Sequence, residues 1–548
     1  MRERKYGLVG SILVIVSVLF VGEAAPSVAI VGNIQYFWWG VLGLAFLVPY
    51  ALFTSELSVT YPDQSNIYGW ITRAFGDKMR TRFSFYYWFN FVLWFTSLAL
   101  LIPITINVST ETQASDGSIL QNGIVTSWQG ALISIAFIWI TVYFMSTNVR
   151  ESKFFICTSG FVKLLMAIII VVLAIQVLCD EGMINYMGVE TFLPSFDFVS
   201  IAPVTIILFN FIGLEVLTAY IPVIKNPKRN IPLAIAIGSV LSIVLYIVCA
   251  FGISLSIPFN EVSLASGIVE AAQMLTHNPE SIIVMILTIL FILTIFGNFI
   301  AWSYGVFGVT KTAALENSLP RVFKSEITRK ISGSAFVTGI VATIFVLIAT
   351  FILESPVDRI WDPNDFFWLF FDLDMTVLFL CYVPLFPAFL KLRKIDPDTP
   401  RPFKVPGNRF VLFILGWVPT IVIAFAAIVN LIPEDGSSAE LEEKGFELLS
   451  GILVVVIGEV LVFLTRRRSK KLANQIKTSQ IGDDLTNQTS KDEINKTKIN
   501  QIDNISTNQM DGIKDNKTEI NYADSNSVNQ TDNSQPDKPI SPFNDDKI

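Results

Sequence analysis

The stretch TIILFNFIGLEVLTAYIPVIKNPKRNIP, from Thr205 to Pro232, is apolar over enough residues to cross a membrane, yet polar groups interrupt it. Asn210, Gly213 and Glu215 lie in its middle, and a basic loop follows. A carboxylate at membrane depth costs about 2.5–3.5 kcal/mol on insertion scales, which makes Glu215 a candidate functional residue. Gly213 is a natural point for the helix to open, because glycine tolerates backbone conformations that end a helix. We therefore take this stretch as the centre of a predicted substrate site.

The composition of the chain is that of a membrane protein with many spans. Of its 548 residues, 52% are hydrophobic and 16% are charged, against about 25% charged in soluble domains. Four scattered cysteines and one histidine exclude a disulfide framework, a metal cluster and histidine-based catalysis. Because the sequence shows no nucleophile–base set or phosphate-binding loop, we expect no enzyme, cofactor or metal site. The net charge of −7 gives no reason to expect a nucleic-acid partner.

Twelve apolar segments have the length of about 20 residues that a bilayer core requires. They fall at 7–31, 36–60, 84–107, 125–147, 154–178, 199–224, 232–256, 281–313, 334–353, 365–390, 409–432 and 446–465. Basic residues gather in alternate loops, nineteen in one set against two in the other. By the positive-inside rule, this pattern predicts a multi-pass plasma membrane protein with both termini in the cytoplasm.

The two ends of the chain differ from its apolar body. The apolar run near the N-terminus continues past Pro26, which favours a retained first helix over a cleaved signal peptide. Residues 466–548 are rich in Asn, Asp, Lys, Ser and Thr and have almost no aromatic residues. Such a segment cannot bury enough apolar surface to offset its ordering entropy. We predict a transporter domain over 1–465 and a disordered cytoplasmic tail over 466–548.

The first apolar segment carries a polar interruption of its own, VGEAAP at 21–26. Each interruption opens a block of five segments, and the two blocks have opposite orientations because five is odd. Interrupted helices at corresponding positions of inverted halves indicate a transport site at the membrane midplane. Half-helix N-termini can bind a carboxylate and unwound carbonyls an ammonium, a pairing that suits an amino acid. Gly and Pro could instead only ease helix crossing, but the occurrence of two matching interruptions favours a site.

Several stretches resemble the amino acid–polyamine–organocation (APC) transporters. They are NFIGLE with IKNPKRNIPLAI, PYALFTSELSVTYPDQSNIYGW, AWSYGVFGVTKTAALENSLPRVF and RPFKVPG. EVSLASGIVEAAQML, and the run from RPFKVPG to LIPEDGSS, resemble the glutamate:GABA antiporters within that superfamily. The resemblance covers residues 5–466. It implies an all-α membrane protein with twelve helices, in which helices one and six are discontinuous. The five-plus-five inverted repeat would comprise repeat one at about 7–178 and repeat two at about 199–390, with peripheral helices over 409–465.

The same resemblance implies the residues of a substrate site. Gly22, Glu23 and Ala24 match the unwound segment of helix one, where Glu23 departs from the usual small residues. Phe209 matches an aromatic gate, and Trp302 matches a tryptophan that packs on the side chain of the substrate. With Gly213 as the hinge of helix six, these residues form the predicted binding site.

Two buried charges are predicted to serve coupling or gating. Glu215 matches a helix-six glutamate that some relatives use for proton-linked gating. Lys163 matches a helix-five lysine that replaces a bound cation in several sodium-independent members. Lys163 lies ten residues beyond Lys153, about 15 Å deep at 1.5 Å per residue, which is too far for the lysine to snorkel comfortably. Desolvation would make such an ammonium suited to cycling protons.

Other acidic residues carry weaker expectations. Asp372 and Asp374 either extend an outer vestibule or lie near the membrane surface. Glu56 is expected to be structural, and Glu459, outside the transport core, is a candidate for a homodimer contact.

The function implied by the resemblance is secondary active amino acid transport by alternating access, with exchange of the glutamate/GABA type as the first expectation. A proton-coupled symporter for neutral or cationic amino acids is the main alternative, because a Glu23 carboxylate beside the ligand disfavours acidic substrates. A receptor that no longer transports is a further alternative. The retained interruptions and Trp302 argue against it. The expected partners are amino acids, protons and the lipid bilayer.

Overall fold

The structure is a computed structural model of the whole chain, and it forms two units, Met1–Lys470 and Lys471–Ile548. It describes residues 6–21, 28–29, 31–62, 66–110, 112–113, 119–121, 125–147, 152–195, 198–201, 203–258, 267–276, 281–328, 330–353, 363–432, 441, 444–465, 467, 490–491 and 493–499. The described residues of the second unit, 490–491 and 493–499, are helical and exposed.

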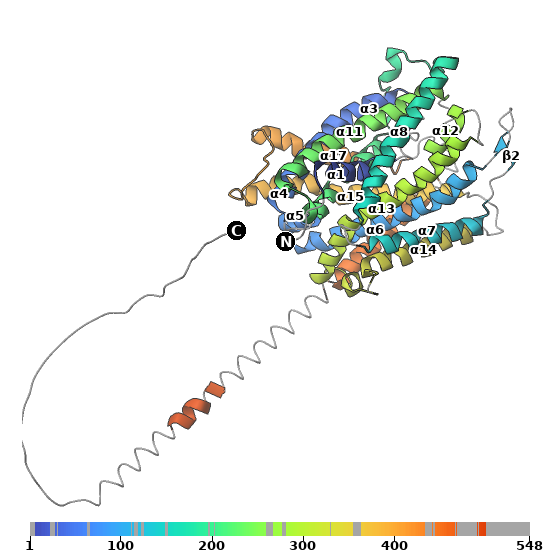
Figure 1. The fold of residues 1–548 in the computed structure, drawn as a ribbon. Helices are drawn as coiled ribbons and strands as arrows, with labels where there is room; N and C mark the ends of the chain where they lie inside the picture. The colour runs from blue at the N-terminus through green and yellow to red at the C-terminus, as the bar shows by residue number, and fades with distance from the viewer. Residues whose placement is uncertain are drawn as a thin grey trace, which may run out of the picture. The chain divides into compact units, whose positions relative to one another are not determined.

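The first unit is a bundle of long apolar helices (Figure 1). Its first half contains α1 (Leu8–Leu19), α3 (Ile34–Leu42), the π-helix η1 (Gly43–Leu47), α4 (Val48–Thr60), α5 (Asn66–Phe75), α6 (Asp77–Val108), α7 (Ser127–Met145), α8 (Lys153–Glu181) and the 3-10 helix η2 (Val189–Phe192). Its second half contains α9 (Phe198–Ile201), α10 (Pro203–Phe211), the 3-10 helix η3 (Leu214–Val223), α11 (Pro227–Ser256), α12 (Ile268–Thr276), α13 (Ile282–Leu315), the 3-10 helix η5 (Arg321–Lys324), α14 (Gly333–Leu353), α15 (Pro363–Tyr382), α16 (Leu385–Ile395) and α17 (Arg409–Val429).

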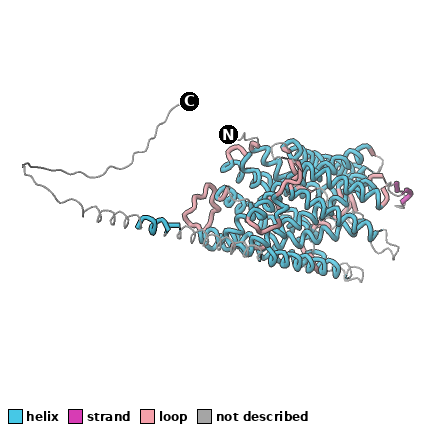
Figure 2. Tube along the Cα trace, turned by 90° about the horizontal axis from the view of Figure 1, so that it is seen from below, coloured by secondary structure: helices cyan, strands magenta, loops and turns pink. Residues whose placement is uncertain are grey.

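A short antiparallel pair, β1 (Thr112–Gln113) and β2 (Ile119–Gln121), lies between α6 and α7 in the chain and at one edge of the unit (Figure 2). The helices α6, α7 and α14 lie side by side (Figure 1).

The apolar segments predicted from the sequence correspond to helices of the structure. Among the described residues, eleven helical segments are long and apolar enough to cross a membrane, from Ile34–Thr60 to Lys444–Thr465. They coincide with the second to twelfth predicted segments. The helix α1 is apolar but only 12 residues long, and it occupies the first part of the predicted segment 7–31. The all-helical membrane fold is therefore confirmed, while the count of twelve spans stays a prediction.

The last two spans lie at the periphery of the bundle. In their most apolar windows, 28% of α17 and 17% of Lys444–Thr465 is buried, against 78% for α6. Their exposed faces carry large apolar side chains such as Ile421, Phe425 and Leu453, as expected for helices that face lipid.

The sixth span is discontinuous, as predicted. The helix α10 ends at Phe211, and Gly213 then takes a φ of +125° and a ψ of 0° before η3 begins at Leu214. A Cβ atom at Gly213 would lie 2.6 Å from Val18 Cγ1 and 2.7 Å from Trp302 Cζ2, so glycine is required here both by the backbone and by the space. The first span is also interrupted, because α1 ends at Leu19 and the backbone is extended at Phe20.

Around α1 pack α8, α11, α13 and η3. The contact with α8 is close: a Cβ atom at Gly160 would lie 2.5 Å from the Leu13 carbonyl oxygen. At the start of α1, the Tyr6 N–H donates to the Val223 carbonyl at 3.0 Å, and the Lys225 N–H donates to the Tyr6 carbonyl at 2.8 Å. The beginning of α1 is thus tied to the end of η3.

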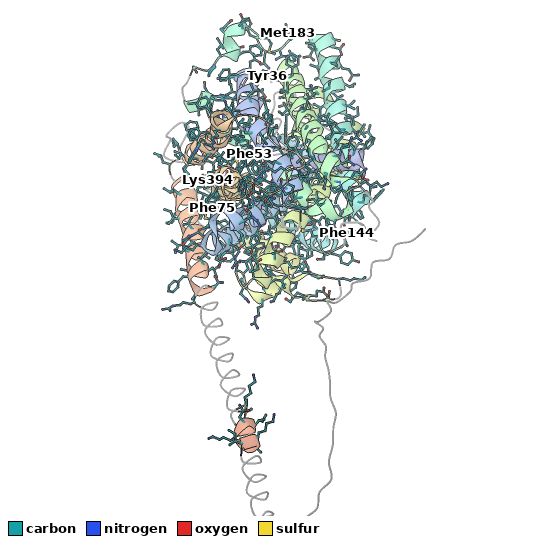
Figure 3. All side chains as sticks on the ribbon, turned by 90° about the vertical axis from the view of Figure 1, so that its left-hand side faces the viewer. Tyr36, Phe53, Phe75, Phe144, Met183 and Lys394 are labelled. Carbon is teal, nitrogen blue, oxygen red and sulfur yellow. The ribbon has the colours of Figure 1, made fainter. Side chains whose placement is uncertain are left out.

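The largest fully buried side chains are aromatic, and Phe53, labelled in Figure 3, is one of them. Phe53 of α4 stacks on Phe389 of α16, with ring centroids 3.6 Å apart. Phe75 and Lys394, from the contacting helices α5 and α16, lie near each other toward one side of the unit (Figure 3).

Candidate functional site

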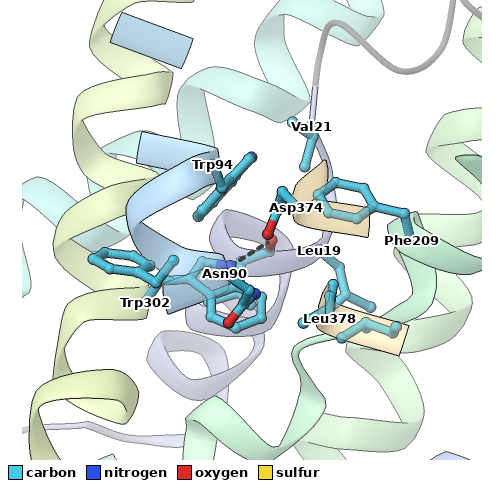
Figure 4. Close-up of a pocket in the computed structure, with 11 residues that line it drawn as sticks. Leu19, Val21, Asn90, Trp94, Phe209, Trp302, Asp374 and Leu378 are labelled. Atoms are coloured by element: carbon cyan, nitrogen blue, oxygen red, sulfur yellow. Dashed lines mark hydrogen bonds between the residues drawn. The ribbon is translucent and has the colours of Figure 1, made fainter. Parts of the chain in front are cut away.

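A pocket lies where the interrupted first and sixth spans meet α6, α13 and α15 (Figure 4). Its cavity volume is about 20 Å³, room for about one water molecule, so its own side chains nearly fill the pocket. The residues that line it are Val18, Leu19, Val21, Asn90, Phe91, Trp94, Phe209, Ile212, Trp302, Asp374 and Leu378. The structure therefore brings the predicted Phe209 and Trp302 together beside the end of α1.

Trp302 holds the end of α1 and also forms a wall of the pocket. Its Nε1–H donates to the Val18 carbonyl at 3.3 Å, and its ring packs beside Gly213. The rings of Trp302 and Trp94 lie 5.7 Å apart at an interplanar angle of 66°. Together with Phe209, they give the pocket an aromatic lining on three elements.

Tyr246, on α11, connects the two interruptions. Its hydroxyl accepts a hydrogen bond from the Val21 N–H at 2.7 Å. The single hydroxyl proton can be donated to the Leu19 carbonyl at 2.7 Å or to Asn210 Oδ1 at 3.1 Å. Tyr246 thus satisfies backbone groups that the end of α1 leaves without helical partners. Tyr246 was not among the predicted site residues, because a tyrosine in an apolar helix carries no distinctive signal.

The predicted residue Lys163 lies behind the pocket and does not line it. Its side chain is 2% exposed, and its ammonium donates to the Ser17 carbonyl at 2.8 Å. Ser17 Oγ also donates to Ser159 Oγ of the same helix α8, at 3.1 Å. A cation beside the last carbonyls of a helix interacts favourably with the helix dipole. Lys163 therefore joins α8 to the end of α1.

Glu215 is surrounded by tyrosines from three other helices. Its Oε1 accepts hydrogen bonds from Tyr87 of α6, at 2.8 Å, and from Tyr382 of α15, while its Oε2 accepts one from Tyr50 of α4. The Tyr50 hydroxyl in turn accepts from the Gly213 N–H at 3.2 Å. This cluster, which we call the tyrosine cluster, fixes the start of η3 and lies outside the residues that line the pocket.

Asp374 gives the pocket a carboxyl group, for which the sequence supported only a weak expectation. Its side chain is 1% exposed and faces the pocket from α15, opposite Asn90 of α6 (Figure 4). The Asn90 amide points toward the carboxyl group, as the dashed line in Figure 4 marks, and no ion pair joins Asp374 to a basic side chain among the described residues. Asn90 Oδ1 is buried without a hydrogen-bond partner among the described residues.

The amino acid permease family model matches residues 6–457. The chain belongs to this family. Membership confirms the predicted APC superfamily, and the structure describes a permease whose pocket lies between its two interrupted spans.

Two relatives of this permease are described as antiporters. "Probable agmatine/putrescine antiporter AguD" of Lactococcus lactis subsp. lactis is 37% identical over 463 residues, which are 84% of this chain and 95% of that protein. "Glutamate/gamma-aminobutyrate antiporter" of the same organism is 22% identical over 465 residues, 83% of this chain and 89% of that protein. The family and these relatives together show that this chain is a transporter.

A solved structure supports the fold. The crystal structure of MhsT in complex with L-phenylalanine matches with a TM-score of 0.50 and 14% identity, and the match covers 78% of this chain and 100% of that one.

The predicted site residues Gly22, Glu23 and Ala24 lie outside the described residues. The residue immediately before them, Val21, is described and lines the pocket. Their predicted role in binding the substrate stays a prediction.

Two acidic residues with weaker expectations form ion pairs within the permease. Asp372 pairs with Lys444 at 3.0 Å and does not line the pocket, so it differs from its near neighbour Asp374. Glu459 forms two hydrogen bonds with Arg82, at 2.5 and 2.7 Å. The predicted homodimer contact at Glu459 stays untested, and the carboxylate already has a partner in its own chain.

Glu56 has a structural position, as expected. Its carboxylate accepts from Arg393 of α16, from Arg401 at 3.0 Å and from the Val405 N–H at 2.7 Å. These contacts fasten the loop that contains RPFKVPG to the end of α4.

A neighbouring ion pair at this end of the bundle joins Arg73 to Asp396, at 2.5 Å. The hydrogen bond from Arg73 lowers the pKa of the Asp396 carboxyl, which keeps the pair charged at neutral pH.

Proposed function

We propose that this permease exchanges small cationic amines across the plasma membrane by alternating access at the described pocket. The observation that carries the proposal is the chemistry of the pocket wall. The described lining consists of aromatic rings, apolar side chains, Asn90 and the carboxylate of Asp374, and it includes no basic side chain. Aromatic faces and a carboxylate attract cations, and they would repel the side chain of a glutamate substrate.

The relatives support this substrate class. The protein named for agmatine and putrescine is 37% identical to this chain, against 22% for the protein named for glutamate and gamma-aminobutyrate. Agmatine and putrescine are slender molecules with a cationic group at each end, and such groups suit a narrow aromatic pocket with one carboxylate.

Exchange of glutamate for GABA is the second candidate. It is favoured by the sequence resemblance to that antiporter family and by a relative that covers 83% of this chain. This reading requires basic or N–H donor groups for the carboxylate of the substrate, and these would have to come from residues outside the described lining.

The proposal also includes orientation and proton coupling. Arg73 and Arg80 lie in one basic segment and Arg393 in another. Their ion pairs with Asp396, Glu316 and Glu56 join parts of the chain that are far apart in the sequence, at one end of the bundle. By the positive-inside rule we assign this end to the cytoplasm. Glu215 and Lys163 are the buried charged groups beside the moving spans, so we assign proton-linked gating to them.

Counterflow in proteoliposomes tests the substrate class. Vesicles loaded with unlabelled agmatine should accumulate labelled putrescine, and vesicles loaded with glutamate should not. Unloaded vesicles control for leak. Leucine and GABA complete the panel as an α- and a γ-amino acid, both zwitterions with no net charge. Accumulation of glutamate or GABA without accumulation of putrescine would overturn the proposal. Repeating the assay with an imposed pH gradient measures proton coupling separately.

A further inference from the structure

Within the proposed function, on which this inference rests, we infer that Asp374 and Asn90 form an anchor for a cationic end-group of the substrate, an ammonium or a guanidinium. Both side chains are buried, at 1% and 6% exposure, and both face the pocket from neighbouring helices α15 and α6 (Figure 4). We call this pair the acidic anchor.

The acidic anchor differs from other carboxylates inside the spans of this protein. Glu215 has three tyrosine donors, Glu56 has two arginines, and Asp372 and Glu447 share Lys444. Asp374 forms no salt bridge with a basic side chain of the described chain, and the Asn90 amide is an uncharged neighbour. A carboxylate held in this way at membrane depth is costly, and a cation supplied by the substrate would offset that cost.

The surroundings of the anchor define the group that fits it. A carboxylate can accept two parallel N–H bonds from a guanidinium or one to two from an ammonium, and the free Oδ1 of Asn90 can accept another. Trp94 and Trp302 line the same pocket, and tryptophan rings attract cations. The apolar side chains of Phe91 and Leu378 suit a methylene chain that joins such an end-group to the rest of the substrate.

The competing explanation is structural: Asn90 alone would balance a carboxylate whose role is to hold α6 against α15. The two explanations predict different effects on transport when the charge of Asp374 is removed. Asp374→Asn keeps the shape and size of the side chain but removes its charge. If the anchor binds a cation, this change weakens recognition of diamines specifically, whereas a structural role predicts equal damage with every substrate.

The test compares three purified variants for putrescine and agmatine exchange and for thermal stabilisation by putrescine. For Asp374→Asn we expect at least about a 30-fold fall in kcat/KM for both diamines and loss of the stabilisation by putrescine, with an unchanged melting temperature of the empty protein. Asp374→Glu should retain part of both signals. Asp372→Asn, two residues away and outside the pocket, is the matched control and should resemble wild type in exchange.

Two outcomes would overturn the inference. One is wild-type exchange and putrescine stabilisation in Asp374→Asn. The other is an equal loss in Asp374→Asn for every substrate that the wild type moves, together with a lower melting temperature, which would assign the pair a structural role. A wild-type protein that exchanges only neutral or acidic amino acids would instead refute the proposed function, so the two failures are distinguishable.

Discussion

Tyr246 shows how one hydroxyl can hold two breaks in the backbone. The end of α1 leaves carbonyl and N–H groups without helical partners, and in a membrane these cannot turn to water. The Tyr246 hydroxyl reaches Val21, Leu19 and Asn210, so both interruptions depend on the same side chain from α11. A change in the backbone at one interruption should therefore alter the hydrogen bonding at the other.

Removal of this hydroxyl should damage the site. Tyr246→Phe keeps the ring, which stacks on Trp39 at 4.9 Å, but leaves buried backbone groups without a partner. Each such group costs about 1–3 kcal/mol, so we expect a melting temperature several degrees lower and exchange reduced at least about tenfold.

Purified protein in detergent gives the melting temperature, and counterflow gives the exchange rate. Tyr86→Phe is the control, since Tyr86 is near the surface and its hydroxyl makes only a long contact of 3.4 Å to the Val455 carbonyl. Equal behaviour of the two variants would show that the Tyr246 hydroxyl has no special role.

At the scale of elements, η3 is a short segment held at both ends. Its start is fixed by Glu215 through tyrosines of α4, α6 and α15, and its end is joined to the beginning of α1 through Tyr6. Between these ends η3 packs against α13 and α1. Movement of η3 therefore requires the tyrosine cluster to release the carboxylate.

Neutralising the Glu215 carboxylate should weaken its hydrogen bonds to the tyrosine cluster. Hydrogen bonds to a charged group contribute about 1.5–3 kcal/mol, and Glu215→Gln removes the charge while adding donors that face three hydroxyls. We expect a lower melting temperature and a flatter dependence of exchange on pH between 5 and 8.

Exchange rates in proteoliposomes at each pH provide the measurement, with the exposed Glu190→Gln as a control. Rates and a pH profile like those of wild type would mean that Glu215 takes no part in gating.

The sequence predicted the elements of this fold better than the contacts between them. Segments such as 409–432 were recognisable because length and hydropathy alone define a span. The break at Gly213 was recognisable because glycine and a carboxylate stand together in an apolar run. The three tyrosines around Glu215 could not be recognised from the sequence, because Tyr50, Tyr87 and Tyr382 meet only when α4, α6 and α15 pack together.

Asp374 illustrates the same limit within the candidate site. Asp372 and Asp374 look alike in the sequence, and only the rotation of α15 decides which side chain faces the pocket and which faces Lys444. Phe209 and Trp302 were predictable through their family pattern, and the structure places both in the pocket lining.

At the scale of the whole molecule, orientation in the membrane decides which end of the bundle meets each compartment. The helix α8 begins next to the basic loop at Lys153 and ends at Glu181, so the proposed orientation places its end outside the cell. Cys179 is exposed near that end, Cys157 is half-buried near the other, and Cys249 and Cys381 are buried.

A thiol reagent that cannot cross membranes should therefore label intact cells at Cys179. We expect Cys179→Ser to abolish this labelling, and Cys157 to react only after the cells are permeabilised. Mass spectrometry of the purified protein identifies the labelled residue. Labelling of Cys157 rather than Cys179 in intact cells would reverse the proposed orientation.

The link between Tyr6 and the end of η3 also bears on leakage. Two backbone hydrogen bonds and the contact between the Tyr6 and Tyr220 rings, 5.6 Å apart, close the bundle at this point. These contacts would have to break together before the interior could open here. Under the proposed exchange, this barrier would make the return of an empty carrier rare and so suppress cycling without a bound ligand.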